Sequence, residues 1–353
     1  MTILFAILLF SVLIFIHELG HFVAAKLSGV KVNEFSLFMG PAIFKKQAGE
    51  TLYAIRCIPI GGYCAMEGED EDTDSPRSFQ KAAWWKRLII LVAGAAMNFI
   101  FGFLIFAILF LPGKQVVRPV VTEFTDCCIF NHENGLRLGD EILELDGEKI
   151  YINGDISTIL NLNPTVEHDV VLLRDGEKIV LKDLTMAHTH LNEKGEEYLH
   201  YGFGFGKAVE ANFLDKLDYV WHVTVDNVRN VRLSLQMILT GRAGLTDMSG
   251  PVGIVQIMAD TAEQSKTALD AFLNMLSFGG FIAVNLAVMN MLPIPALDGG
   301  RVVGLLLTTA IEAVTKKKIN PKYEGYIHGA GMVLLLILMA VIMLKDVIFI
   351  FKG

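Results

Sequence analysis

The sequence predicts an α-helical membrane protein with four transmembrane helices and a β domain inserted between the second and the third. Of its 353 residues, 53% are hydrophobic and only 19% are charged, whereas an ordinary soluble domain has about 25% charged residues. The apolar residues gather in four runs, each near the ~20 residues that cross a bilayer. Between the second and third runs, strand-like segments alternate with turn dipeptides. The net charge of −8 does not indicate binding to nucleic acid.

The four runs cover about 4–25, 88–111, the uncharged segment between Asp270 and Asp298, and about 325–344. The loop after the first run carries nine Lys and Arg residues, and the loop after the third carries five. By the positive-inside rule both loops are cytoplasmic. We therefore expect both termini and residues 112–269 to be extracytoplasmic.

The first run contains the motif His17-Glu18-Leu19-Gly20-His21. Histidines four apart on a helix lie on one face, so both rings can reach one metal ion. Zinc takes such nitrogens at about 2.0–2.1 Å, and Glu18 is then placed to deprotonate a bound water. The alternative is two hydrogen-bonded helix histidines and a neutral glutamate. Ionisable groups in hydrocarbon are costly and functional by default, which favours the metal site.

The first cytoplasmic loop is expected to hold a β-hairpin. Residues 30–38 and 51–58 are strand-like, with a turn region at 47–50, and the segment Pro59-Ile60-Gly61-Gly62-Tyr63 follows. The hairpin either offers its edge to an extended substrate beside the active site or is a plain surface hairpin.

The outer region begins with a predicted β domain over residues 116–186, where Asp146-Gly147 and Asp175-Gly176 are hairpin turn signals. Residues 135–142 read Gly-Leu-Arg-Leu-Gly-Asp-Glu-Ile, which resembles the signature of PDZ domains. Such a domain binds peptides by strand addition if its edge is open, and is otherwise a spacer. Residues 212–240 then show helical periodicity. This amphipathic helix lies either on the outer membrane surface or under the β domain.

A catalytic zinc keeps three protein ligands and one open position, so the two histidines need a partner. Pro293 and Pro295 break the third span, and the freed backbone groups are tolerated only inside protein or beside a cavity. Asp298 follows at the cytoplasmic end, the same depth as His21, and Gly299-Gly300 allow close backbone approach. The alternative for Asp298 is an interfacial charge at a helix end.

Together these motifs resemble the site-2 proteases, a family of intramembrane zinc metalloproteases, and within it the bacterial regulator-of-sigma-E-protease-like group. The matching segments are H-E-x-x-H at 17–21, P-x-G-G-Y at 59–63, the PDZ signature, S-G-P-V-G at 249–253 and N-x-x-P-x-P-x-L-D-G-G at 290–300. The resemblance covers nearly the whole chain. Two departures are one PDZ domain in place of two, and Gly94-Ala95-Ala96-Met97-Asn98-Phe99 in place of G-P-x-x-N-F.

The resemblance implies three kinds of site residue. The expected Zn²⁺ ligands are His17, His21 and Asp298, the expected base is Glu18, and the expected substrate contacts are Gly61, Gly62, Tyr63, Asn285 and Asn290. The two amides fit a place in the bundle interior, where they can hydrogen-bond backbone.

The sequence thus predicts a zinc-dependent endopeptidase of a bacterial cell membrane that cleaves single-span membrane proteins, such as trimmed anti-sigma factors or signal-peptide remnants. Its expected parts are residues 1–111 with two spans and the hairpin, the PDZ domain at 116–186, a linker with an amphipathic helix at 187–269, and 270–353 with the last two spans. Two alternatives stay open: a membrane zinc protease acting on soluble or misfolded polypeptides, and a non-catalytic PDZ scaffold. No oligomeric state is predicted.

Overall fold

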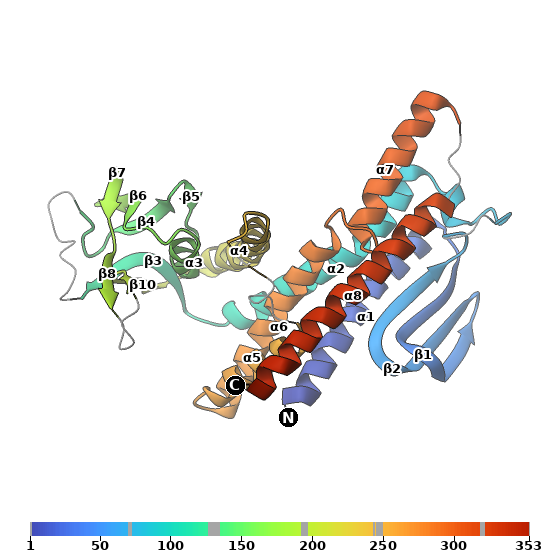
Figure 1. Ribbon diagram of the computed structural model, residues 1–353, viewed down its shortest axis with the longest axis horizontal. Coiled ribbons are helices and arrows are strands. Elements are labelled where there is room, and N and C mark those ends of the chain that lie inside the picture. Colours follow the sequence, from blue (N-terminus) through green and yellow to red (C-terminus); the bar gives the residue numbers. More distant parts are fainter. Residues whose placement is uncertain are drawn as a thin grey trace. The chain divides into compact units, whose positions relative to one another are not determined.

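The computed structural model describes residues 2–69, 73–125, 135–191, 197–242, 244, 250–317 and 322–352. The chain forms two compact units (Figure 1). The first comprises Met1–Ile105 and Gly241–Gly353, and the second comprises Phe106–Thr240. Ser249, the first residue of the S-G-P-V-G segment, lies outside the described residues.

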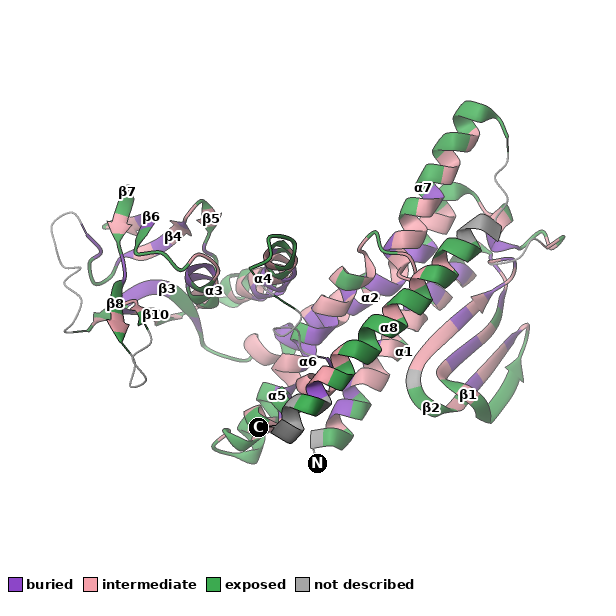
Figure 2. Ribbon diagram, in the orientation of Figure 1, coloured by how far each residue is buried: buried purple, intermediate pink, exposed green. Residues whose placement is uncertain are grey.

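The first unit contains helices and a β-hairpin, and among its described residues four helices are long and apolar enough to cross a membrane. These are α1 (Thr2–Ser28), α2 (Trp84–Phe110), α6 (Ala268–Asn290) and α8 (Lys322–Lys352). The four predicted spans are therefore confirmed as helices. Helix α8 is exposed along most of its length (Figure 2), and no residue in its most apolar stretch is buried. Such an apolar, uncovered helix is suited to lipid contact.

Shorter helices complete this unit: the 3₁₀ turn η1 (Phe79–Lys81), α5 (Pro251–Glu263) and α7 (Asp298–Thr315). Helices α1 and α2 approach so closely that a Cβ added at Gly20 would lie 2.3 Å from the carbonyl oxygen of Ala93. Leu13 of α1, Met258 of α5 and Ala283 of α6 are buried in one apolar cluster. This packing fixes the face of α1 that carries the histidine motif.

The predicted hairpin is present, with strands longer than the sequence indicated. Strand β1 (Val32–Ala48) pairs antiparallel with β2 (Thr51–Met66). Positive φ angles at Phe38 (70°) and Gly40 (85°) bend β1, so that Val32–Leu37 pairs with β2 on both sides. Its partners are Leu52–Ile55 on one side and Gly62–Met66 on the other. Among the described strands, Gly62–Met66 has no second partner and forms an edge of the sheet.

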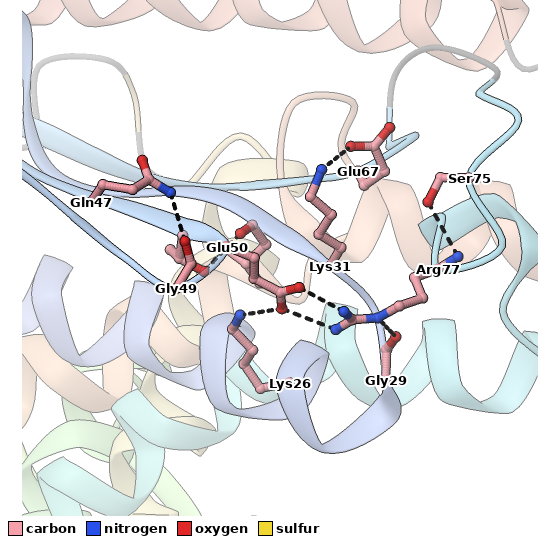
Figure 3. A network of polar contacts seen from close by, with 11 residues as sticks. Lys26, Gly29, Lys31, Gln47, Gly49, Glu50, Glu67, Ser75 and Arg77 are labelled. Atoms are coloured by element: carbon pink, nitrogen blue, oxygen red, sulfur yellow. Dashed lines mark hydrogen bonds and ion pairs between the residues drawn. The ribbon is translucent and has the colours of Figure 1, made fainter.

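The hairpin turn is tied to the end of α1 by an ion-pair network (Figure 3). Lys26 donates to Glu50 at 2.7 Å, and Arg77 donates to the two oxygens of Glu50 at 2.6 and 3.0 Å. Arg77 also donates to the carbonyl of Gly29 at 3.1 Å. Hydrogen bonds from Arg77, then Lys26, lower the pKa of Glu50 to about 2. The network therefore holds the hairpin beside α1 while Glu50 is ionised.

The second unit contains an antiparallel sheet with the order β10-β3-β4-β6-β7, and β5 pairs with β4. Its strands are β3 (Gln115–Phe124), β4 (Glu141–Leu145), β5 (Glu148–Lys149), β6 (Glu167–Arg174), β7 (Glu177–Thr185) and β10 (Phe203–Glu210). A separate hairpin joins β8 (His188–Leu191) to β9 (Glu197–His200). The core packs α3 (Asn153–Leu162) against the sheet and includes Leu136, Ile142, Ile156, Leu172 and Phe203. The sheet continues past residue 186, because β10 pairs with β3.

Both Asp-Gly dipeptides form turns, with positive φ at Asp146 (51°) and Asp175 (52°). Helix α4 (Phe213–Leu239) packs against α3. Arg229 lies 2.6 Å from carboxylate oxygens of both Asp155 and Asp226. Burial, with a smaller contribution from Asp155, raises the pKa of Asp226 to about 7. The contact with α3 is a reason for the amphipathic pattern of α4.

Candidate active site

The two histidines of α1 and the aspartate at the start of α7 lie together. The Nε2 atoms of His17 and His21 are 3.2 Å apart. Each is also 3.2 Å from Oδ2 of Asp298. The three atoms therefore form a nearly equilateral triangle, although Asp298 follows His21 by 277 positions in the sequence.

The loop 291–297 carries Asp298 into this position. Helix α6 ends at Asn290, and Pro293 cannot donate the hydrogen bond that would continue it. The backbone of the loop then folds onto the first turn of α7. A Cβ at Gly299 would lie 2.3 Å from the carbonyl of Leu292, and a Cβ at Gly300 would lie 2.3 Å from that of Ile294. Only glycines at both positions allow this close return.

The triangle has the dimensions of a zinc site. Bonds of about 2.0–2.1 Å in a tetrahedron place ligand atoms about 3.3–3.4 Å apart, close to the 3.2 Å found here. Oδ2 of Asp298 is buried and has no hydrogen-bond partner, which a bound cation would supply. Two imidazoles and a carboxylate are zinc donors, and three of them leave a fourth position for water. The residues present therefore fit the ion.

Neighbouring groups orient both imidazole rings. Nδ1 of His21 lies 2.8 Å from the carbonyl oxygen of Ile90. Because a carbonyl only accepts, this nitrogen carries the proton and Nε2 is left free for a metal. Nδ1 of His17 lies 3.5 Å from the amide nitrogen of Asn98 and 3.4 Å from that of Asn290. When either amide is turned over, so that its oxygen replaces the nitrogen, it accepts the Nδ1 proton and directs the lone pair of Nε2 to the triangle.

A cavity of about 680 Å³ opens onto the triangle. Glu18 lines it beside His17 and His21, and the sheet edge Gly62–Met66 borders it. A Cβ at Gly62 would lie 3.3 Å from Cγ of Glu18, so the strand passes directly by this carboxylate. The cavity thus brings together the triangle, an acidic group that can accept a proton, and a strand edge that can receive an extended peptide.

The structure brings most of the expected site residues together. His17, Glu18, His21, Gly62, Tyr63 and Asp298 line the cavity, and Asn290 contacts His17. Asn285 and Gly61 are partly buried but are not among the described residues that line it.

Sequence reasoning assigned no role to Gly94 or Asn98, although both lie in the noted segment 94–99. A Cβ at Gly94 would lie 2.3 Å from Nε2 of His21, so this glycine leaves room for the rings. The sequence likewise gave no indication of the ion pair between Arg301 and Glu69, and both of these residues line the cavity. A glycine four residues before an asparagine in an apolar helix was the available signal for Gly94 and Asn98.

An H-E-x-x-H helix, an aspartate that forms a triangle with its two histidines and an open cavity together define the class of this protein as the zinc metalloproteases. The chain belongs to peptidase family M50, the site-2 proteases, whose family model matches residues 5–338.

The chain is 35% identical to a protein of Clostridium acetobutylicum named as a candidate zinc metalloprotease, over 99% of this chain and 98% of that protein. It is 29% identical to the regulator of sigma-W protease RasP of Bacillus subtilis, over 98% of both chains. Identity to the zinc metalloprotease RasP of Bacillus licheniformis is 28%, again over 98% of both chains.

Proposed function

We propose that this zinc metalloprotease cleaves single-span membrane proteins within the bilayer, near its cytoplasmic face. His17, His21 and Asp298 hold the zinc in this proposal, and Glu18 is the base. The observation that carries it is that two corners of the 3.2 Å triangle come from α1, whose apolar span Ile3–Ser28 surrounds the motif. Ionisable groups at such a depth are otherwise costly.

The chemistry follows from the groups around the cavity. When bound, zinc polarises the scissile carbonyl and lowers the pKa of a bound water to about 7. Glu18 takes the proton of the attacking water and can return it to the leaving amine. Asn98 and Asn290 keep the His17 ring in place. The Ile90 carbonyl does the same for His21.

The sheet edge provides a way to present the substrate. A transmembrane helix hides its carbonyls in i−4 hydrogen bonds, so a scissile bond becomes accessible only when the helix unwinds locally. The unpaired side of Gly62–Met66 can take up the freed backbone by strand addition. Glu18 and the triangle lie beside this edge, which places the carbonyl within reach of the attacking water.

The substrates we propose are single-span proteins already trimmed on the outer side, such as anti-sigma factors. The name of the Bacillus subtilis relative, regulator of sigma-W protease, supports a role in regulated proteolysis. The basic loops 26–87 and 301–322 support a bacterial membrane orientation with both termini outside. Residues 116–186, which we assign to a PDZ-like domain, then stand outside.

The central test is Glu18→Gln in the purified full-length protein. It should retain wild-type zinc content and lose cleavage of a single-span substrate, because it removes the base and no ligand. An unfolded soluble polypeptide is offered in parallel. Wild-type turnover by the variant would refute the mechanism, and cleavage of the soluble polypeptide alone would favour a protease for soluble or misfolded proteins. A wild-type protein that holds zinc but cleaves neither substrate would favour the non-catalytic scaffold.

The outer domain is proposed to restrict access, so that bulky untrimmed ectodomains are rejected. Since β10 belongs to the same sheet, the test replaces residues 115–210 with a short Gly/Ser linker. The deletion should still cleave a trimmed substrate and should also cleave the untrimmed form in cells lacking the first protease. If the deletion variant binds zinc but still does not cleave the untrimmed substrate, the domain has a docking or folding role instead.

A further inference from the structure

The loop that carries Asp298 contains a strained turn. Leu297 donates its backbone N–H to the carbonyl of Ile294 at 3.1 Å. Pro295 and Ala296 are the two central residues, and Ala296 has a φ of 84°. Proline followed by a residue of positive φ is the pattern of a type II turn, whose second central position favours glycine. Here that position holds alanine, two residues before Asp298.

A side chain of α8 contacts this strained peptide. The N–H of Ala296 donates to Nδ1 of His328 at 3.1 Å, so the neutral ring carries its proton on Nε2. In a type I turn the peptide between Pro295 and Ala296 is flipped, and Ala296 takes an ordinary negative φ. That flip would turn the N–H away from His328 and bring the Pro295 carbonyl toward the unprotonated nitrogen. His328 therefore favours the strained form over the relaxed one.

The same face of α8 is shaped to receive the turn. Gly331 lies one helical turn after His328, and a Cβ there would lie 2.4 Å from Cβ of Pro295 and 2.7 Å from its carbonyl oxygen. A Cβ at Gly329 would meet nothing within 4 Å. The turn therefore contacts α8 in two ways: it donates a hydrogen bond to His328, and it packs closely where Gly331 has no side chain. The next residue of α8, Met332, lines the active-site cavity.

We infer that His328 is a positioning residue for the zinc centre: with Gly331 it holds the 294–297 turn in its strained form and so places Asp298 against His17 and His21. The inference rests on the proposed role of Asp298 as a zinc ligand. Strain stored beside a functional group persists only where surrounding contacts impose it. Here the contact comes from a span that contributes none of the proposed ligands.

The test measures zinc affinity of purified full-length variants by competition with a chromogenic chelator. His328→Leu removes the acceptor and should weaken zinc binding about fivefold, the size of one net hydrogen bond. His328→Asn, whose side-chain oxygen can take the place of Nδ1, should largely restore it. Ala296→Gly removes the strain, so His328→Leu in that background should recover most of the lost affinity. Gly331→Ala should weaken zinc binding, whereas Gly329→Ala should not.

Wild-type zinc affinity in His328→Leu would overturn the inference. The inference would also be overturned if His328→Leu weakened zinc binding equally with alanine and with glycine at position 296, because the histidine would then not act through the turn. If His328→Leu does not fold, the pair Gly331→Ala and Gly329→Ala decides, and equal affinities in that pair would also overturn it. Asp298→Ala serves as the benchmark: unchanged zinc affinity in that variant would refute the proposed ligand set, a failure distinct from that of His328.

Discussion

Gly94→Ala should disrupt the zinc site from a helix that supplies none of its proposed ligands. Gly94 lies on α2, and its missing side chain leaves the space that the two imidazoles occupy. An added Cβ would lie 2.3 Å from Nε2 of His21 and 2.7 Å from Cε1 of both His17 and His21. The methyl group would thus stand where the metal-facing edge of His21 now lies.

The expected size of the effect follows from these distances. Ordinary contact begins at 3.4 Å, so the ring or the helix must move by about 1 Å, half the length of a zinc–nitrogen bond. Functional constellations must be held to within about 0.5 Å. Overpacking of this kind costs about 1–3 kcal/mol, and if this cost falls on the zinc-bound geometry it corresponds to a loss of zinc affinity of roughly five- to 150-fold.

The assay compares Gly94→Ala with Gly102→Ala, two helical turns further along α2. A Cβ at Gly102 would also clash, at 2.6 Å from Cγ2 of Val284, but Val284 does not line the active-site cavity. Both variants should melt at a lower temperature, and only Gly94→Ala should release zinc to a chelator. Wild-type zinc affinity in Gly94→Ala, or equal losses in both variants, would refute the assignment of this glycine to the site.

Three further predictions concern the ligand set, the second unit and the topology. Asp298→Ala should lower zinc affinity together with activity, measured by chelator competition; loss of activity at wild-type affinity would show that Asp298 is not a ligand. The pKa of Asp226 is raised to about 7 by burial, so the folded second unit favours the protonated form of this carboxyl. The stability that Asp226 contributes is therefore complete below about pH 4 and is lost as the pH rises through 7. Asp226→Asn should therefore raise the melting temperature of this unit by a few degrees at pH 8 and change it little at pH 4, and equal shifts at both pH values would contradict this. In intact cells, Asp74→Cys should be protected from impermeant thiol reagents and Glu177→Cys should react; the reverse pattern would invert the proposed orientation.

The sequence predicted those parts of the protein that depend on local pattern. Apolar runs near twenty residues long predicted the four helices, and each helix begins within about four residues of its predicted start. The ends differ more: α6 stops at Asn290, before Pro293, and α8 continues to Lys352. The four-residue spacing of His17 and His21 placed both rings on one face of a helix, because that spacing is fixed by helical geometry. Asp-Gly dipeptides located two turns of the β domain. The sequence also indicated Asp298 as a candidate third ligand, although only from its depth in the membrane and a family resemblance.

Contacts between distant segments were decided by the tertiary structure alone. The 3.2 Å triangle depends on how α1, α2 and the loop after α6 pack. So do the positions of Gly94 and Asn98 beside the histidine rings, for which the sequence offered only their spacing in an apolar helix. The pairing of β10 with β3 extends the sheet past the last strand that the hydrophobic pattern indicated. The strained Ala296 and its bond to His328 are the clearest case. Periodicity reports which face of one element is apolar, but not which residue of another element meets it or which backbone conformation that contact imposes.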